Sequence, residues 1–187
     1  MKKTVIGLMM FLSYYSNAQE TEYTFTAEKG MTDFIVTSVE GKTAPEIYKK
    51  TIEWIKVTFK NPDKVILSTI ENEFIRLEGF SETLYSYNAM GQRFTPSKFQ
   101  IEISIKDGKY KFDLVGLQEL VDANWREVSF FTSKTTQEEL EKAYIFKKDG
   151  TLRSTYKFAN EVPTYFNNLN KSLVESIIST VKKTDGW

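Results

Sequence analysis

The chain has 187 residues, with 25 basic and 25 acidic side chains, and it contains neither cysteine nor histidine. A nearly neutral chain without a basic run lacks the charge that nucleic acids and anionic membranes attract. The missing cysteines and histidines exclude disulfide bonds, histidine-based catalysis and metal sites built on either residue. We therefore expect one core that packing alone stabilises, with no metal, no cofactor and no nucleic-acid partner.

The first 18 residues have the organisation of a secretory signal peptide. Lys2 and Lys3 precede an apolar run over residues 5–12, and small residues occupy the position of signal-peptidase cleavage, which we place after Ala18. The run is too short to cross a bilayer, which takes about 20 apolar residues. We expect the mature protein to be exported to the periplasm or the extracellular space, without a membrane span.

After the signal peptide, the sequence predicts a short lead-in, a strand and a helix. Residues 19–30 carry charge and threonine without a period, whereas residues 31–39 cluster β-branched and aromatic side chains as strands do. Thr43, Pro45 and Glu46 then match the capping box that begins a helix. The apolar arc of this helix consists of Ile47, Tyr48, Thr51, Ile52, Trp54, Ile55, Thr58 and Phe59.

Two further strands and an irregular stretch follow the helix. Residues 65–70 and 73–80 alternate as strands do and predict a pair joined by a tight turn. Residues 81–97 contain a glycine and a proline as breakers. This stretch predicts a loop or a ragged edge strand.

The most specific local signal is a hairpin over residues 98–117. Two alternating runs meet at Asp107-Gly108, the pair that two-residue hairpin turns favour because both positions need positive φ. A slip of one residue would turn every apolar side chain to the opposite side, so the turn fixes the register. The facing apolar pairs in this register are Ile105 with Tyr110, Ile103 with Phe112, and Ile101 with Leu114.

The remaining segment is less regular until the last helix. Residues 118–160 are rich in aromatic side chains and predict a short helix after a possible capping box at Thr136 and Glu139, with one or two further strands. Pro163 is expected to begin the last helix. Its apolar residues recur at helical spacing and are Phe166, Leu169, Leu173, Val174, Ile177, Ile178 and Val181.

The predicted order of elements defines one α+β domain over residues 31–187. It reads β-α-β-β-β-β-α, an antiparallel sheet with the helices packed on one face and with residues 118–160 as an additional segment. The stretches IVTSVEGKTAPEIYKKTIEWIKVTFKNPDKVI, IRLEGFSE and IEISIKDGKYKFDLVGL resemble the exported envelope proteins of domain-of-unknown-function family 4468. The resemblance covers roughly residues 31–117 plus the final helix. It implies a TATA-binding-protein-like fold, and it implies no activity and no DNA binding.

The hairpin register also places two carboxylates opposite each other. If the isoleucines of the hairpin face the helices, Glu102 and Asp113 share the far face of the sheet. Such a pair suits the acid and base of a glycosidase, a weak Ca²⁺ site, or two solvated side chains relieved by the diagonal Lys111. We favour the solvated pair, because a retaining glycosidase needs its carboxyl groups about 5–5.5 Å apart in a cleft.

The far face of the sheet is also expected to carry apolar bulk. In the predicted strand over residues 73–80, Phe74 and Phe80 share one face. We favour the aromatic-rich residues 118–160 as the cover of this face, because aromatic side chains more often fill cores than bind ligands. An incomplete cover would leave a partner surface, for which the further candidates are Trp125, Phe130 and Phe131.

These observations favour a non-enzymatic function. We interpret the chain as an exported envelope protein that binds another envelope protein, a peptide or an apolar ligand through the far sheet face or a sheet edge. The alternative is a carboxylate-based, glycosidase-like hydrolase that uses Glu102 and Asp113. A third hypothesis is a structural piece of a larger envelope assembly without a ligand of its own.

Overall fold

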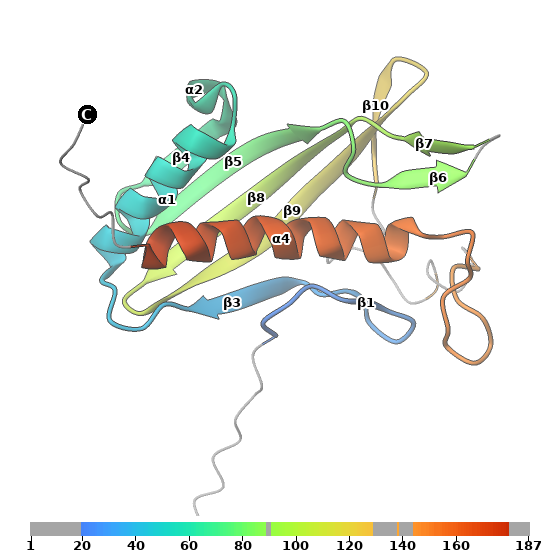
Figure 1. The fold of residues 1–187 in the computed structure, drawn as a ribbon, viewed down its shortest axis with the longest axis horizontal. Coiled ribbons are helices and arrows are strands. Elements are labelled where there is room, and N and C mark those ends of the chain that lie inside the picture. Colours follow the sequence, from blue (N-terminus) through green and yellow to red (C-terminus); the bar gives the residue numbers. More distant parts are fainter. Residues whose placement is uncertain (1–19, 89–90, 129–137, 139–143, 180–187) are drawn as a thin grey trace, which may run out of the picture.

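An antiparallel sheet forms the centre of the computed structural model, which describes residues 20–88, 91–128, 138 and 144–179. The strand order is β10-β9-β8-β5-β4, and β3 pairs with β9 beyond the stretch that β10 occupies. The strands are β3 (Phe34–Ser38), β4 (Ile66–Ile70), β5 (Phe74–Ser81), β8 (Ser97–Lys106), β9 (Lys109–Val121) and β10 (Asn124–Glu127). The helices α1 (Ala44–Thr58) and α4 (Phe158–Ile178) pack on one face of this sheet (Figure 1). The predicted fold class, α+β with an antiparallel sheet, is confirmed.

Smaller elements flank the central sheet. The one-turn helix α2 (Pro62–Val65) leads into β4, and β1 (Phe25–Thr26) pairs with β2 (Gly30–Met31). A second small hairpin consists of β6 (Ser86–Asn88) and β7 (Gln92–Phe94). No helix among the described residues is both long and apolar enough to cross a bilayer.

The helix α1 begins where the capping box predicts it. The Glu46 carboxylate accepts hydrogen bonds from the backbone N–H of Thr43 at 2.8 Å and from its hydroxyl at 2.9 Å. Both bonds stabilise the ionised carboxylate and hold the pKa of Glu46 below its usual value. The Asp107 carboxylate of the hairpin turn accepts a further hydrogen bond from the backbone N–H of Ala44 at 2.7 Å. The turn therefore also satisfies the first helical donor.

The β8–β9 hairpin has the predicted register. All three apolar pairs across the hairpin form as expected. Gly108 takes a φ of +73° in the turn, whereas Asp107 does not take the positive φ expected at both turn positions. Beyond Leu114 the register shifts at a β-bulge, so that Gln100 pairs with Gly116 and Val115 is left over. The inward side chains of the hairpin are buried against both long helices, and they are Phe99, Ile101, Ile103, Ile105, Tyr110, Phe112, Leu114 and Leu117.

The segment predicted as a lead-in packs into this core. Tyr23 is only 2% exposed, and its hydroxyl donates to the carbonyl of Phe112 at 2.8 Å and accepts from the N–H of Leu114 at 3.0 Å. Phe112 is itself paired with Ile35 of β3, whereas Leu114 lies one residue beyond the last pair, so the Tyr23 hydroxyl meets β9 where β3 ends. The Tyr23 side chain, and not a strand, makes this contact to β9. The sequence around Tyr23 therefore does not alternate as strands do.

The structure decides one open prediction and corrects another. Where the sequence predicts a loop or a ragged edge strand, over residues 81–97, the chain forms the short β6–β7 hairpin, which the Glu161 carboxylate of α4 holds by accepting from the backbone N–H of Ser86 at 2.6 Å. The last helix begins at Phe158, five residues before the expected start at Pro163. The helix continues through the proline at the loss of one backbone bond, because Val162 and Phe166 are fully buried on either side of it.

Candidate functional site on the open sheet face

The face of the sheet that points away from α1 and α4 is called the open face here. Pairing between neighbouring strands places directly opposite side chains on the same face, so the pairs Arg76 with Glu102, Glu102 with Asp113, and Phe34 with Asp113 share it. Along the strands, the residues two positions away belong to it as well. Its main members are Phe34, Val36, Phe74, Arg76, Glu78, Phe80, Lys98, Gln100, Glu102, Ser104, Lys111 and Asp113.

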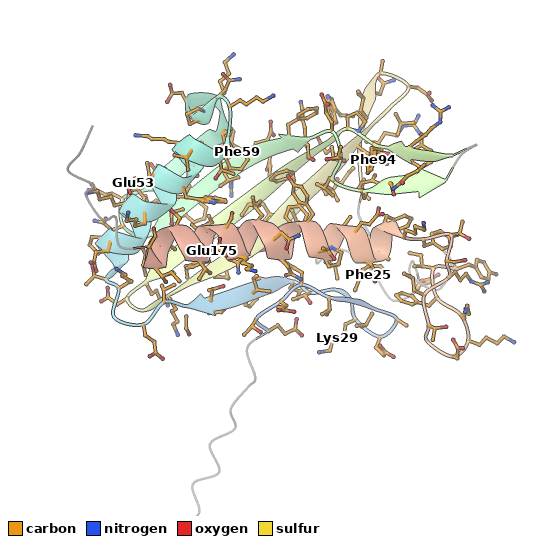
Figure 2. All side chains as sticks on the ribbon, viewed as in Figure 1. Phe25, Lys29, Glu53, Phe59, Phe94 and Glu175 are labelled. Atoms are coloured by element: carbon orange, nitrogen blue, oxygen red, sulfur yellow. The ribbon has the colours of Figure 1, made fainter. Side chains whose placement is uncertain are left out.

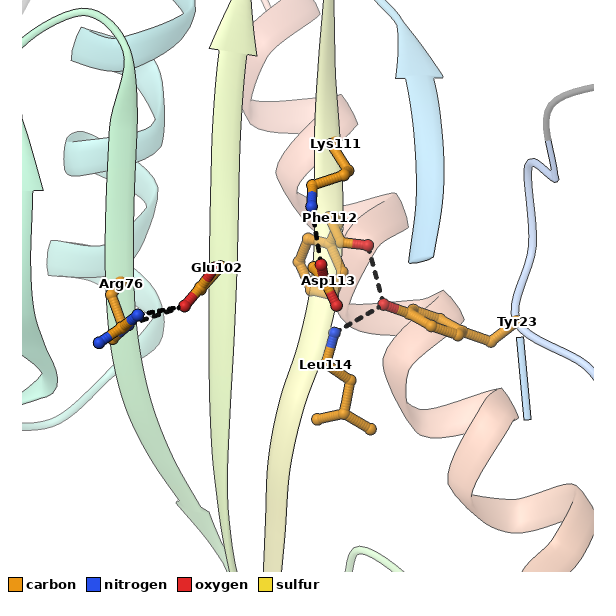
Figure 3. A network of polar contacts seen from close by, with 7 residues as sticks. All are labelled: Tyr23, Arg76, Glu102, Lys111, Phe112, Asp113 and Leu114. Carbon is orange, nitrogen blue, oxygen red and sulfur yellow. Dashed lines mark hydrogen bonds and ion pairs between the residues drawn. The ribbon is translucent and has the colours of Figure 1, made fainter. Parts of the chain in front are cut away.

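Glu102 and Asp113 lie opposite each other, as the sequence predicts, and a cation binds each of them. Arg76 on β5 donates from Nε to a carboxylate oxygen of Glu102 at 2.9 Å, with a second, shorter bond from Nη2. Lys111 donates to Asp113 at 2.8 Å (Figure 3). From the sequence, we expect Lys111 to offset the repulsion between the two carboxylates. In the structure Arg76 binds Glu102, and Lys111 binds Asp113 on its own strand.

This arrangement has consequences for chemistry. A retaining glycosidase needs its two carboxyl groups free to act on a substrate in a cleft, whereas here an ion pair occupies each of them. A hollow of about 190 Å³ on this face is lined by Gln100, Gln118 and Glu78 and contains neither member of the pair. In the described part of the chain, no cluster of three or more acidic residues is placed to hold a metal ion. The geometry therefore fits two ion-paired carboxylates, those of Glu102 and Asp113, on a flat surface.

Aromatic rings lie beside the same two cations. The Lys111 Nζ atom is 5.0 Å from the ring centroid of Phe34, and the Arg76 guanidinium is 5.9 Å from that of Phe74. Phe34 stays 43% exposed. Each carboxylate of the facing pair therefore binds a cation that also lies beside an aromatic ring: Arg76 with Phe74 for Glu102, and Lys111 with Phe34 for Asp113.

A second aromatic group occupies the other end of the open face. The rings of Phe80 and Trp125 meet edge to face with centroids 6.4 Å apart, and the Lys98 Nζ atom lies 4.4 Å from the Trp125 ring. Phe80 is 52% exposed. Two candidates that lie 45 positions apart in the sequence are thus brought together. The other two candidates, Phe130 and Phe131, lie outside the described residues, as does the capping box at Thr136 and Glu139.

The described part of residues 118–160 is mainly placed beside the sheet. Residues 118–127 extend it as the end of β9 and as β10, from which the Trp125 ring reaches the open face. Residues 144–157 lead into α4 beside β1, where the Phe146 ring stacks on Phe25 at 5.5 Å. Over the described residues, the predicted cover therefore contributes an added strand and a small separate cluster.

The fold defines a class of α+β proteins in which helices pack on one side of an antiparallel sheet, and no helix of the described residues packs on the other side. Residues 35–119 match the model of a family described as "Domain of unknown function (DUF4468) with TBP-like fold". This match confirms, over residues 35–119, the resemblance found in the sequence.

Two solved structures are similar to the chain. A DUF4468 family protein from Bacteroides ovatus aligns with a TM-score of 0.60 at 14% identity, over 83% of this chain and 91% of that one. A TBP-like protein from Parabacteroides distasonis aligns with a TM-score of 0.53 at 13% identity, over 77% and 90%. Identities this low show the fold alone. No protein with a curated function matches the chain in sequence.

Proposed function

We propose that the protein is an exported, non-enzymatic binding module that engages another envelope protein, a peptide or an apolar ligand through the open face or an edge of its sheet. The open face supports this proposal. It combines exposed Phe34 and Phe80 with charges that are already paired. Aromatic and arginine side chains are enriched where proteins bind each other, and paired charges cost less to bury than single ones.

Binding through the open face is tested by capture of partners from the native envelope. Replacing Phe34→Ser and Trp125→Ser together removes aromatic area from both ends of the face. We expect the double variant to lose the partners that the unchanged protein captures. The matched control is Phe94→Ser, an exposed phenylalanine on β7 (Figure 2). Equal capture by all three proteins would contradict a binding role for this face.

Export rests on the first 18 residues, which lie outside the described part of the chain. Two lysines, a short apolar run and small residues before Gln19 match a cleavable signal. Mass spectrometry of the protein from the native envelope or the medium should find Gln19 as the first residue. A full-length chain confined to the cytoplasm would overturn the proposal.

The hydrolase alternative remains a prediction from the facing carboxylates. It requires that Glu102→Gln or Asp113→Asn abolish turnover of a glycan substrate. The ion pairs to Arg76 and Lys111 instead favour a structural effect, in which either variant leaves its cation without a partner. We expect no glycan turnover by the unchanged protein in a screen of reducing-sugar release.

A further inference from the structure

We propose that an extended peptide with acidic side chains binds along the outer edge of β5, between this edge and the C-terminal end of α1. The proposal names a site and a partner chemistry for the binding role described above, and it rests on that role. Its four grounds are an unpaired strand edge, the direction of the backbone there, a groove beside it, and the charge of the groove wall.

The strand β5 is longer than its outer neighbour. Strand β4 pairs with β5 only over residues 74–77, whereas β8 pairs with all of β5 on the other side. The chain that leads into β4 is turned away from the sheet as α2, so β4 begins at Ile66 opposite Leu77. Residues 78–81 therefore form an open edge about 13 Å long, at roughly 3.3 Å per residue.

The backbone of this edge is directed outward at two residues. The N–H of Ile105 donates to the carbonyl of Glu73 at 2.7 Å, so the odd-numbered residues of β5 direct their backbone groups toward β8. Alternation then directs the N–H and C=O groups of Glu78 and Phe80 toward the open edge. The bridge between Ile66 and Leu77 places the N–H of Glu78 against the last residue of α2, so the backbone groups that face the open edge are the C=O of Glu78 and both groups of Phe80. Such an edge can pair with a further strand.

A groove of about 590 Å³ lies beside the open edge. One wall is formed by β5 from Glu78 to Phe80, and the other by the end of α1 and α2, with Phe59, Lys60 and Lys64. Phe59 lies at the end of α1 next to this part of the sheet (Figure 2). A groove between a strand edge and a helix is the geometry in which domains add a peptide as an extra strand.

The charge of the groove selects the kind of peptide. The wall from α1 and α2 contributes two lysines and no acidic side chain to the lining. Lys60 and Lys64 are exposed, and neither forms an ion pair within the described residues. Across the groove, the lining carries Glu82 and Glu78, and the Glu78 carboxylate accepts a hydrogen bond from Gln100 at 3.1 Å on the open face. Acidic side chains facing the two lysines are therefore complementary.

The test uses the mature full-length protein and a capped nine-residue peptide of alternating valine and glutamate. We expect the amide proton of Phe80 to exchange rapidly in the free protein and to become protected when the peptide binds, as measured by NMR. A matched peptide with lysine for glutamate should bind at least about tenfold more weakly. A valine–glutamate peptide N-methylated on the residues that face β5 should lose binding, because it lacks the donors of the added strand.

Charge reversal on the protein separates the groove from general electrostatics. The double variant Lys60→Glu, Lys64→Glu should raise Kd for the acidic peptide by about tenfold or more. The matched control is Lys49→Glu, Lys56→Glu, on exposed positions of α1 that do not line the groove. The control should bind as the unchanged protein does.

Three outcomes would overturn the proposal: no binding at millimolar peptide, binding without protection of the Phe80 amide, or equal weakening by both charge reversals. If the peptide fails while the Phe34 and Trp125 variant still loses its envelope partner, the edge site is wrong and the function proposed for the open face stands. If the peptide protects the β5 amide while the Phe34 and Trp125 variant still captures its envelope partner, the edge site holds and the open face is not used.

Discussion

At the scale of single residues, the hydroxyl of Tyr23 bonds to the backbone of β9 where the pairing with β3 ends. It bridges the carbonyl of Phe112 and the N–H of Leu114, and Asn167 of α4 binds both the N–H and the C=O of Tyr23 at 2.7 and 3.0 Å. The N-terminal segment, the edge of β9 and α4 are therefore joined through one side chain. Buried backbone groups rarely stay unpaired, so this role is structural.

Removal of this hydroxyl should destabilise the fold. Tyr23→Phe leaves the N–H of Leu114, which lies beyond the last β3 pair, without its partner, at a cost of about 1–3 kcal/mol in the free energy of unfolding. Urea denaturation followed by circular dichroism measures the change. Tyr48→Phe is the control, because this half-buried phenol makes no hydrogen bond within the described residues, and its change should stay within about 0.5 kcal/mol. Equal stability of Tyr23→Phe and the unchanged protein would contradict the bridging role.

At the scale of elements, the parts that could be predicted are those that local sequence determines. The capping box at Thr43 begins α1, and Asp107-Gly108 sets the hairpin register, because both signals need only a few neighbouring residues. The contact from Asp107 to Ala44 spans 63 positions and depends on how the hairpin packs on the helix. The start of α4 before Pro163 likewise depends on tertiary packing that outweighs a local helix breaker.

The close packing of β5 on β8 gives a prediction for this element. A Cβ atom at Gly79 would lie 2.2 Å from the Phe99 ring, which is itself held against Phe166 with centroids 5.3 Å apart. Gly79→Ala should therefore lower the free energy of unfolding by about 1–3 kcal/mol or more. At Gly116 the nearest atom would be the Gln100 Cβ at 3.7 Å, an ordinary contact.

Gly116→Ala is thus the matched control for the strand. Thermal unfolding of both variants measures the difference, and we expect the free energy of unfolding of Gly116→Ala to change by less than about 0.5 kcal/mol. Similar losses in both variants would mean that the Phe99 ring does not hold β5 and β8 at this distance.

At the scale of the whole molecule, burial of phenols makes stability depend on alkaline pH. Burial raises the pKa of Tyr23, Tyr85 and Tyr110 far above the ordinary 10.0, with a further rise from Asp113 beside Tyr23 and from Glu119 bonded to Tyr85. The folded state therefore keeps these phenols neutral. The unfolded state loses their protons above pH 10, so stability is present below this pH and falls as the pH rises.

Phenolate absorbance and circular dichroism, followed together in an alkaline titration, measure this effect. Tyr23, Tyr85 and Tyr110 should ionise only as the circular dichroism signal of the fold disappears. Ionisation of all tyrosines in a protein that still has native circular dichroism would contradict the burial of these three.

The candidate site could be predicted in part for a related reason. Glu102 opposite Asp113 follows from the hairpin turn between them. The partner Arg76 lies on β5, and residues 81–97 separate this strand from β8, so no short turn fixes that register. The meeting of Phe80 and Trp125 depends on the order of strands in the sheet. Local signals define the β8–β9 hairpin, whereas its neighbours β5 and β10 supply the side chains that bind beside Glu102 and Lys98 on the open face.

The most direct test of the central claim, an open sheet face that is free to bind, is thiol labelling in a chain without native cysteines. Ser104→Cys places a thiol on the open face, and Ser97→Cys places one on the covered face, where Ser97 is fully buried. In the folded, full-length mature protein, Ser104→Cys should react with a maleimide nearly as fast as in urea, and Ser97→Cys about a hundredfold more slowly. Slow labelling of both variants would show that the face is covered and would contradict the account.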